Sequence, residues 1–270
     1  MVCPMCGEGV DRGRTGRPRT YCSRSCQARA YRRRRDEGRL SAVRTGTSAA
    51  AGEESLVDDA IGLADDQGIH ALTLRSLAHR RGQALVTLQR DLGSRDRLVA
   101  LMVQRVFGGP ADASGRADGE ALVDVLARLA LAEWQAYRAH PWLVEVMTTT
   151  RPPLVPAVLA QAEAVIAAFT ELGIVREEAF GRYLALSAYI QGMATLVVAE
   201  EQETGRTETS YRAWWLDQFR ALDRTGATTR HPWLATLGDT RSADAFDADA
   251  TFRAGLPRII RGLTASDRSL

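Results

Sequence analysis

The chain has 270 residues, of which 45% are hydrophobic and 25% charged, so it can hold more than one domain and a sizeable core. No apolar run has the ~18 to 20 residues of a membrane span, and the N-terminus lacks the apolar stretch of a secretory signal. We therefore expect a soluble cytoplasmic protein with no membrane partner. The net charge of +2 combines +8 in residues 1–50 with −6 in residues 51–270. A basic head on an acidic body predicts that the head contacts a polyanion.

All four cysteines of the chain lie in its first 26 residues, with the spacing C-x2-C-x15-C-x3-C: Cys3, Cys6, Cys22 and Cys26. Two close pairs of thiols are typical of a tetrahedral zinc site with Zn–S bonds of about 2.3 Å. An N-terminal segment of fewer than about 40 residues buries too little apolar surface to fold without a bound metal or a disulfide. The sequence therefore predicts a structural zinc ion. The alternatives are four unliganded thiols or a redox sensor that loses its metal on oxidation.

Arginines follow the last cysteine closely, at Arg29 and Arg32 to Arg35. A helix is expected to start near Ser23 and Ser25, and Gly38 ends it. We interpret residues 1–40 as a zinc-binding basic module, with Arg32 and Arg33 as candidate DNA contacts. The alternative is a solvated basic tail with only non-specific attraction. Residues 41–52 are small and polar, which predicts a flexible linker.

Residues 53–107 have the pattern of four helices separated by short breaks. The first helix ends at Gly68, Thr73 caps the second, Gly82 forms a turn, and Ser94 starts the fourth. A helix, a short turn containing glycine and a further short helix form the helix-turn-helix pattern. The third helix, from about Ala84 to Asp91, is therefore the candidate recognition helix.

Residues 56–102, LVDDAIGLADDQGIHALTLRSLAHRRGQALVTLQRDLGSRDRLVALM, resemble the DNA-binding domain of TetR-family bacterial repressors. The marks are Gly68, Gly82, the Thr87-Leu88 pair and two motifs, Leu72-Thr73-x-Arg75-x-Leu77-Ala78 and Ser94-Arg95-x-x-Leu98. The cysteine segment is similar to short zinc-finger appendages found on such regulators. The resemblance implies a two-domain, all-α fold, a DNA-binding function and a bacterial, nucleoid-associated location.

The candidate DNA-contacting residues come from the recognition helix and from positions that match the family. On the helix, Arg90 can bond a guanine, Gln89 an adenine, and the Thr87 methyl group can touch a thymine. The resemblance implies a base contact for Arg75 and contacts near the DNA backbone for Thr73 and Arg95. The chain departs from the family at Gln89, where a tyrosine is usual, at Asp91, where a histidine is common, and at Gln83. The candidates are Thr73, Arg75, Ala84, Val86, Thr87, Gln89, Arg90 and Arg95.

Residues 119–265 are expected to form an all-helical domain for ligand binding and dimerisation, with helices near 120–139, 142–148, 155–172, 176–203, 208–224 and 249–264. Aromatic and polar side chains on these helices suggest a pocket for a small apolar or amphipathic inducer, although ordinary core packing explains them too. The candidate ligand-binding residues are Trp134, Tyr137, Met147, Tyr183, Gln191 and Trp214.

The helices at 176–203 and 249–264 match those with which family members form homodimers. The second carries Phe252, Leu256, Ile259, Ile260 and Leu263 at helical spacing. This stripe must be buried, either in a two-fold four-helix bundle or within the chain.

No catalytic constellation is present: the sequence has no glycine-rich phosphate loop and no nucleophile elbow, so we expect no enzyme. The function we expect is a ligand-released repressor that binds palindromic double-stranded DNA as a dimer. The alternatives are a protein-interaction adaptor with a degraded recognition helix and a zinc- or redox-responsive regulator.

Overall fold

The computed structural model describes residues 2–10, 20–30, 49–109, 116–237 and 247–265. The chain divides into two compact units, Met1–Leu56 and Val57–Leu270. Within the described residues the regular elements are helices, apart from an isolated antiparallel bridge between Val2 and Gly9. The predicted all-α class is therefore confirmed.

The described part of the first unit is built around the cysteines. The bridge between Val2 and Gly9 closes a tight turn, and the Cys3 N–H donates to the Glu8 carbonyl at 2.7 Å. A short helix occupies residues 24–30, and buried Cys3, Val10 and Cys26 form a small core beneath it. Residues 11–19 between the two cysteine pairs, the expected continuation of the basic helix with Arg32 and Arg33, and residues 41–48 of the expected linker lie outside the described residues.

The first long helix, α2, spans Ala49–Gln67. It includes the last four residues of the expected linker, so the prediction that residues 49–52 are linker is wrong. Three consecutive alanines, the residues with the highest helix propensity, start the helix. Small residues occur both in linkers and in helices, and residues 49–52 form the first turn of a helix.

Helices α3 (Leu74–Arg81), α4 (Leu85–Leu92) and α5 (Arg95–Phe107) complete the predicted four-helix DNA-binding domain. Thr73 caps α3 in a reciprocal capping box: its Oγ1 accepts from the Ser76 N–H at 2.9 Å, and Ser76 Oγ accepts from the Thr73 N–H. Gly82 ends α3 in the left-handed conformation, with φ of 62°. Ser94 caps α5 as expected.

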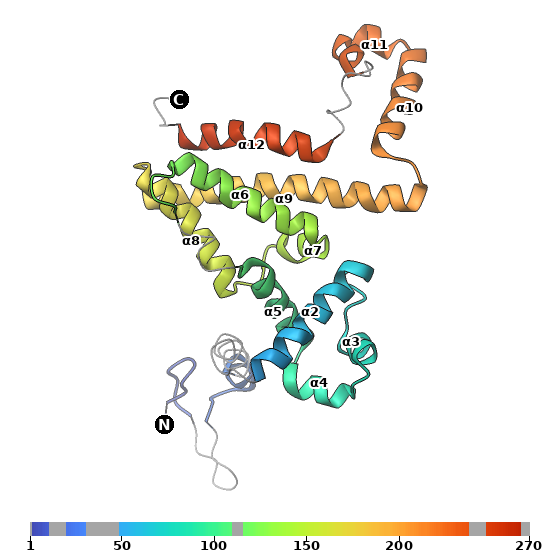
Figure 1. Cartoon of the computed structure of the whole chain (residues 1–270). Helices are drawn as coiled ribbons and strands as arrows, with labels where there is room; N and C mark the ends of the chain where they lie inside the picture. Colours follow the sequence, from blue (N-terminus) through green and yellow to red (C-terminus); the bar gives the residue numbers. More distant parts are fainter. Residues whose placement is uncertain (1, 11–19, 31–48, 110–115, 238–246, 266–270) are drawn as a thin grey trace. The chain divides into compact units, whose positions relative to one another are not determined.

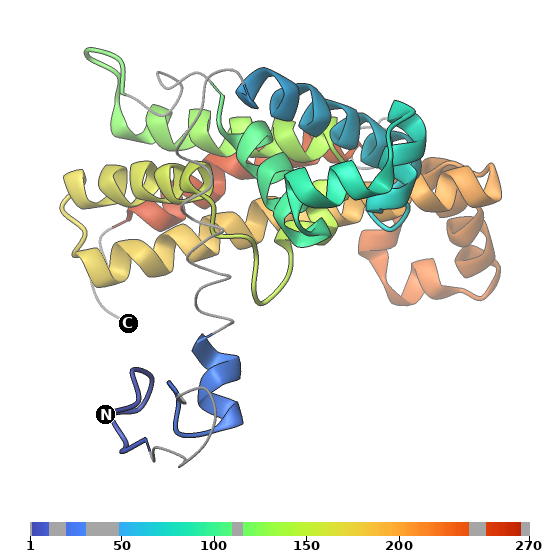
Figure 2. The same cartoon turned by 90° about the horizontal axis from the view of Figure 1, so that it is seen from below.

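The remaining helices form a domain around one long helix. Figure 1 shows α9 (Arg176–Thr207) with α6 (Leu122–Ala139) and α12 (Ala248–Thr264) alongside it. Figure 2 shows α8 (Pro156–Glu171, yellow) beside the first half of α9, and α7 (Trp142–Met147) also contacts α9. The largest fully buried side chains of this domain are Trp134, Tyr137, Trp142, Phe169 and Phe252.

Helix α10 (Tyr211–Arg224) follows the end of α9, where Glu208 adopts a left-handed conformation with φ of 56°. Between α10 and α12, where the sequence pattern predicted no helix, the described residues contain α11 (Ala227–Arg230) and the 3-10 helix η3 (Pro232–Leu237). These elements share a small core of their own, made by Phe219, Ala227 and Leu234 with Trp215 and Leu222 packed against it.

Among the described helices, α9 alone is long and apolar enough to cross a membrane by length and composition. Its contacts with α6, α8 and α12 give it a different role, as the central helix of the domain. Only 33% of its most apolar window is buried inside the chain, so much of its apolar surface stays uncovered.

Candidate functional site

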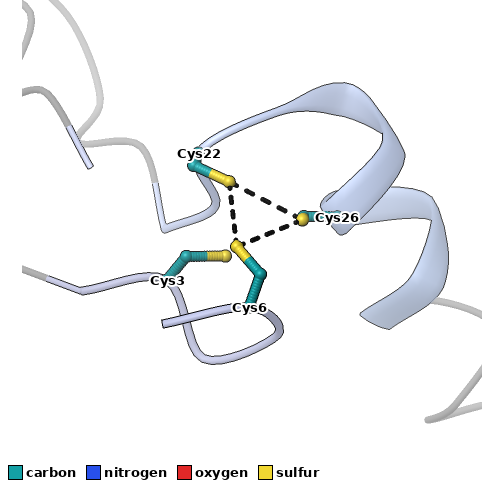
Figure 3. Close-up of side chains that lie close together, drawn as sticks. All are labelled: Cys3, Cys6, Cys22 and Cys26. Carbon is teal, nitrogen blue, oxygen red and sulfur yellow. Dashed lines mark hydrogen bonds between the residues drawn. The ribbon is translucent and has the colours of Figure 1, made fainter. Parts of the chain in front are cut away.

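The four cysteine side chains of the first unit converge on one point (Figure 3). The Sγ atoms of Cys6, Cys22 and Cys26 are 3.3, 3.6 and 3.7 Å apart, and all four sulfurs lie within 4.8 Å of one another. Four sulfurs bound tetrahedrally at about 2.3 Å from a zinc ion are separated by about 3.8 Å. The cluster therefore has the chemistry and the dimensions of a four-thiolate metal site.

The local fold positions these thiols and tunes them. Cys3 and Cys6 come from the turn closed by the Val2–Gly9 bridge, and Cys26 comes from the helix over residues 24–30. A backbone hydrogen bond from Cys22 lowers the pKa of Cys3 to about 6, which favours its thiolate. The neighbouring sulfurs of Cys6 and Cys26 raise the pKa of Cys22 to about 12.

The helix-turn-helix in the second unit presents one side of α4 to solvent. Leu88 and Leu92 are buried and fix the helix in place, whereas Val86 is 71% exposed. Ala84, Gln89 and Arg90 are exposed, Thr87 is half-buried, and Thr73 and Arg75 are exposed around the start of α3. The structure thus brings the candidate DNA-contacting residues of α3 and α4 to the solvent-exposed side of this motif, and DNA contact by each of them stays a prediction.

Two of the candidate arginines have partners within the domain. Arg90 Nε lies 3.1 Å from Asp91 Oδ1, and both side chains are exposed. Arg95 donates from Nε to the Leu72 carbonyl at 2.7 Å and from Nη2 to the Ile69 carbonyl at 2.6 Å. Arg95 therefore ties the start of α5 to the turn before α3, a structural role that the sequence pattern did not indicate.

The candidate ligand-binding residues do not gather in one place. Trp134 stacks on Phe252 of α12, with ring centroids 4.1 Å apart, and its Nε1 donates to Asp249 at 2.8 Å. Met147 is buried in α7. Trp214 lies on α10 beside Tyr211 and Trp215 and is 48% exposed, so α10 carries it as part of a separate aromatic group.

Tyr137, Tyr183 and Gln191 belong to a polar cluster that sequence reasoning located only in part. Its centre is Glu133 on α6, which is 9% exposed. Tyr137 Oη donates to Glu133 Oε1 and Gln161 Nε2 donates to Glu133 Oε2, both at 3.2 Å. The Gln191 side chain lies beside the Tyr137 hydroxyl, and the Ser187 side chain lies beside the Tyr183 hydroxyl. Burial raises the pKa of Glu133 to about 7.

A signal for Glu133 was present in the sequence. It lies four residues before Tyr137, so both share one face of a helix, and the neighbouring Ala130 and Trp134 are apolar. An acid on an otherwise apolar helix face is a candidate for a buried functional group.

A groove of about 700 Å³ lies between α6, α9 and α12, near the start of α10. Met193, Leu196 and Val197 give it an apolar side, whereas Glu200, Glu201, Glu203, Asp247 and Asp249 give it five carboxylates. Arg138 pairs with two of them, at 2.6 Å from Glu201 and 3.5 Å from Asp249. Two of the five carboxylates in this groove, those of Glu201 and Asp249, therefore have a cationic partner in Arg138.

Three of the five residues in the apolar stripe of the last helix are buried within the chain. Phe252, Leu256 and Ile260 pack inside, where α12 contacts α6 and α9. Of the two alternatives, packing within the chain holds for these three residues, whereas Ile259 and Leu263 stay partly exposed, and dimerisation through this helix stays a prediction. Uncovered apolar side chains occur instead on α9, where Phe180, Leu184 and Leu196 are 51%, 50% and 64% exposed.

Comparisons with known proteins agree with this architecture. Residues 116–266 match the family described as "Tetracyclin repressor-like, C-terminal domain". The chain is 30% identical over 213 residues to the HTH-type transcriptional repressor DrrR1 of Streptomyces coeruleorubidus, covering 78% of this chain and 76% of that protein. It is 28% identical over 222 residues to an HTH-type transcriptional regulator of Saccharopolyspora erythraea, with 79% and 85% covered.

Two solved structures illustrate the shared fold. The TetR family protein ActR of Streptomyces coelicolor, in complex with actinorhodin, is 22% identical with a TM-score of 0.65, covering 80% of this chain and 98% of that chain. TetR from Acinetobacter baumannii AYE is 19% identical with a TM-score of 0.55, and 79% and 98% are covered.

A helix-turn-helix domain joined to a larger helical domain defines a DNA-binding transcriptional regulator, not an enzyme. The family match and the relative at 30% identity place this chain in the TetR family of transcriptional regulators.

Proposed function

We propose that this regulator is a ligand-released repressor that binds a palindromic operator as a homodimer. The observation that carries the proposal is the exposed face of α4, held rigid by Leu88 and Leu92 and flanked by the capped start of α3. Such a helix can enter the major groove and read base edges through Gln89, Arg90 and the Thr87 methyl group. A protein that works on chromosomal DNA in this way acts in the bacterial cytoplasm.

Dimerisation is supported by the uncovered apolar side of α9. Phe180, Leu184 and Leu196 are at least half exposed, and small residues on the same helix, including Ala185, Ala188 and Gly192, are exposed too. Small residues allow close approach of a second helix, and exposed apolar side chains gain free energy when they are covered. A two-fold dimer through α9 also matches the symmetry of a palindromic operator.

Release by a small molecule is the proposed regulatory step. A ligand bound among the helices of the C-terminal domain would favour a dimer in which the two reading heads no longer fit successive major grooves. The ligand shifts this equilibrium only by its difference in affinity for the two forms. The ligand class we expect is an apolar or amphipathic molecule, because the helical domain combines aromatic side chains with a few buried polar groups.

The N-terminal module is proposed to hold zinc through Cys3, Cys6, Cys22 and Cys26. The support is the fit between the sulfur separations and tetrahedral thiolate coordination. Four protein ligands leave no open position on the metal, so the ion would supply folding energy and no catalysis. The arginines after Cys26 would then add phosphate contacts beside the operator half-site.

The test is selection of bound sequences from a random double-stranded DNA pool, by the full chain and by its Cys22→Ser/Cys26→Ser variant. Zinc content is measured on both proteins by mass spectrometry, with one ion per chain expected for the wild type and none for the variant. A palindromic motif selected by both proteins, with weaker affinity and shallower salt dependence for the variant, supports the proposed operator binding and the proposed role of the zinc module.

Other results separate the parts of the proposal. A motif shortened in the variant would make the cysteine module a sequence reader. Failure of both proteins to enrich any DNA would contradict the repressor proposal and favour a protein-interaction adaptor.

A further inference from the structure

The described residues include two buried polar side chains, Glu133 and Ser187, both in the helical domain, and Tyr183 lies beside Ser187 and interacts electrostatically with Glu133. Glu133 comes from α6 and Ser187 from α9, so the cluster lies where these two helices and α8 meet. Buried acids are rare in protein cores unless they are paired. This concentration of polarity in an otherwise apolar interior indicates a binding group.

Glu133 is hydrogen-bonded only weakly for a carboxylate. Its hydrogen-bond partners are the neutral Tyr137 hydroxyl and the neutral Gln161 amide, each at 3.2 Å. A hydroxyl bound to a fully ionised carboxylate normally approaches to about 2.5–2.7 Å. The two donors therefore satisfy the carboxyl oxygens without supplying the opposite charge that a buried carboxylate requires.

Other acids of the same domain do have a cationic partner. Glu120 pairs with Arg128 at 2.9 Å, and Glu201 pairs with Arg138 at 2.6 Å. Throughout the described part of the chain, no arginine or histidine forms an ion pair with Glu133. The titratable groups facing it are Tyr137 on its own helix and Tyr183 on α9, and α8 contributes the neutral Gln161.

The cluster is graded from a buried centre to a more accessible edge. Glu133 and Tyr137 are buried, whereas Gln161, Tyr183 and Gln191 are partly exposed. The side of the cluster nearest to solvent therefore carries two amides, from α8 and α9, and one tyrosine from α9. Tyrosine rings are also favourable neighbours for a cation.

Within the proposed function, on which this inference rests, we propose that Glu133 anchors the protonated amine of an amphipathic aromatic ligand. The protonated amine supplies the positive charge that Glu133 lacks among its neighbours in the described part of the chain. The ammonium group of the ligand stays protonated on binding. If the Glu133 carboxyl group is protonated before binding, it loses this proton to the buffer. The raised pKa of Glu133, about 7, makes such an exchange available near neutral pH.

The same contact can transmit binding to the DNA-binding domain. The Tyr137 ring packs edge-to-face on Phe107, the last residue of α5, with centroids 6.4 Å apart. An amine that takes over Glu133 breaks the bond from Tyr137 and leaves this ring free to shift against α5. Helix α5 in turn packs on the recognition helix α4.

The test compares two fluorescent probes that differ only in their polar group, 9-(aminomethyl)anthracene and 9-anthracenemethanol. Binding to the full chain is measured by fluorescence anisotropy at neutral pH. We expect the amine to bind at least about tenfold more tightly, since a hydrogen bond between charged groups adds at least that factor. Glu133→Gln, which keeps the shape and removes the charge, should reduce the preference to about threefold or less.

The control variant is Glu203→Gln, which removes a carboxylate from the acidic groove between α9 and α12. The preference for the amine should survive in this variant. A preference kept in Glu133→Gln but lost in Glu203→Gln would assign the amine to the groove and overturn the inference. Absence of any preference, or of amine binding up to its solubility limit, would overturn it too.

A second readout needs no variant. Calorimetry of the wild type in two buffers with different ionisation enthalpies should show proton release on binding the amine, larger at pH 6 than at pH 8, and none with the alcohol. Equal release at both pH values would contradict the role of Glu133. Neither measurement uses DNA. A negative result for amine binding would therefore contradict the role of Glu133 alone, whereas failure to select an operator would contradict the proposed repressor function.

Discussion

Asp65 on α2 accepts a hydrogen bond from Trp142 Nε1 on α7, at 2.9 Å. The same carboxylate lies 3.0 Å from His140 Nδ1 at the end of α6. One acid of the DNA-binding domain thus holds two aromatic side chains of the larger helical domain, and Trp142 is itself buried. A second link nearby joins His70 Nε2 to Glu145 Oε2 at 2.8 Å.

The Asp65 contact should contribute measurably to stability. Asp65→Ala leaves the buried Trp142 indole N–H without its partner, so we expect a loss of about 1–3 kcal/mol of unfolding free energy. The matched control is Asp66→Ala, whose carboxylate forms a surface pair with Arg80, and here the loss should stay below about 1 kcal/mol. Urea denaturation of both variants measures the difference, and equal losses would contradict a special role for Asp65.

Glu133 should make stability depend on pH. Its pKa is raised from 4.5 to about 7 in the folded state, so the folded protein binds more protons than the unfolded chain between these values. The contribution of Glu133 to stability therefore falls as pH rises from about 4.5 to 7, by up to about 3 kcal/mol. Glu133→Gln removes this term. The stability of the variant relative to wild type should rise over that pH range in urea denaturation, and a constant difference would refute the assignment.

Substitutions of Arg90 and Asp91, which form an ion pair on α4, should change DNA affinity in opposite directions. Arg90→Ala is expected to weaken operator binding by about 1–3 kcal/mol and to relax sequence preference at one position. Asp91→Asn removes a negative charge facing phosphate and frees Arg90, so affinity should rise about two- to fivefold. Arg220→Ala on α10 serves as the control, and gel-shift titration on the selected operator measures all three.

Gly82 should be intolerant of a side chain for conformational reasons alone. Its φ is 62°, and no atom lies within 4 Å of the position a Cβ would take, so Gly82→Ala introduces strain without a clash. We expect a loss of about 1–2 kcal/mol. The same substitution at Gly205, inside α9 and also in open space, should stabilise by about 0.5–1 kcal/mol. Thermal unfolding of both variants should give shifts of opposite sign.

The exposed apolar face of α9 can be tested directly. Leu196→Arg places a charge where the proposed dimer buries an apolar side chain, and we expect monomers in light scattering after gel filtration. The control is Leu159→Arg on α8, a leucine that is also half exposed. If both variants were monomers, or if both were dimers, the result would contradict α9 as the dimer interface.

Local patterns in the sequence were sufficient for the order of the helices. Thr73, Gly82 and Ser94 act through their own backbone and near neighbours, so their roles as caps and turn could be read without knowing the fold. The four cysteines were likewise recognisable from their spacing, because metal chemistry dictates the number and type of ligands.

The tertiary structure decided what depends on residues distant in the chain. Whether Phe252 and Ile260 face a partner or their own chain depends on the placement of α6 and α9, which no periodicity reveals. Likewise, Glu133 became the centre of a polar cluster only when α8 brought Gln161 to it and α9 brought Gln191 to the neighbouring Tyr137. Helical periodicity determines which side of each helix is apolar, whereas packing between helices determines which side chains meet and which are withdrawn from water.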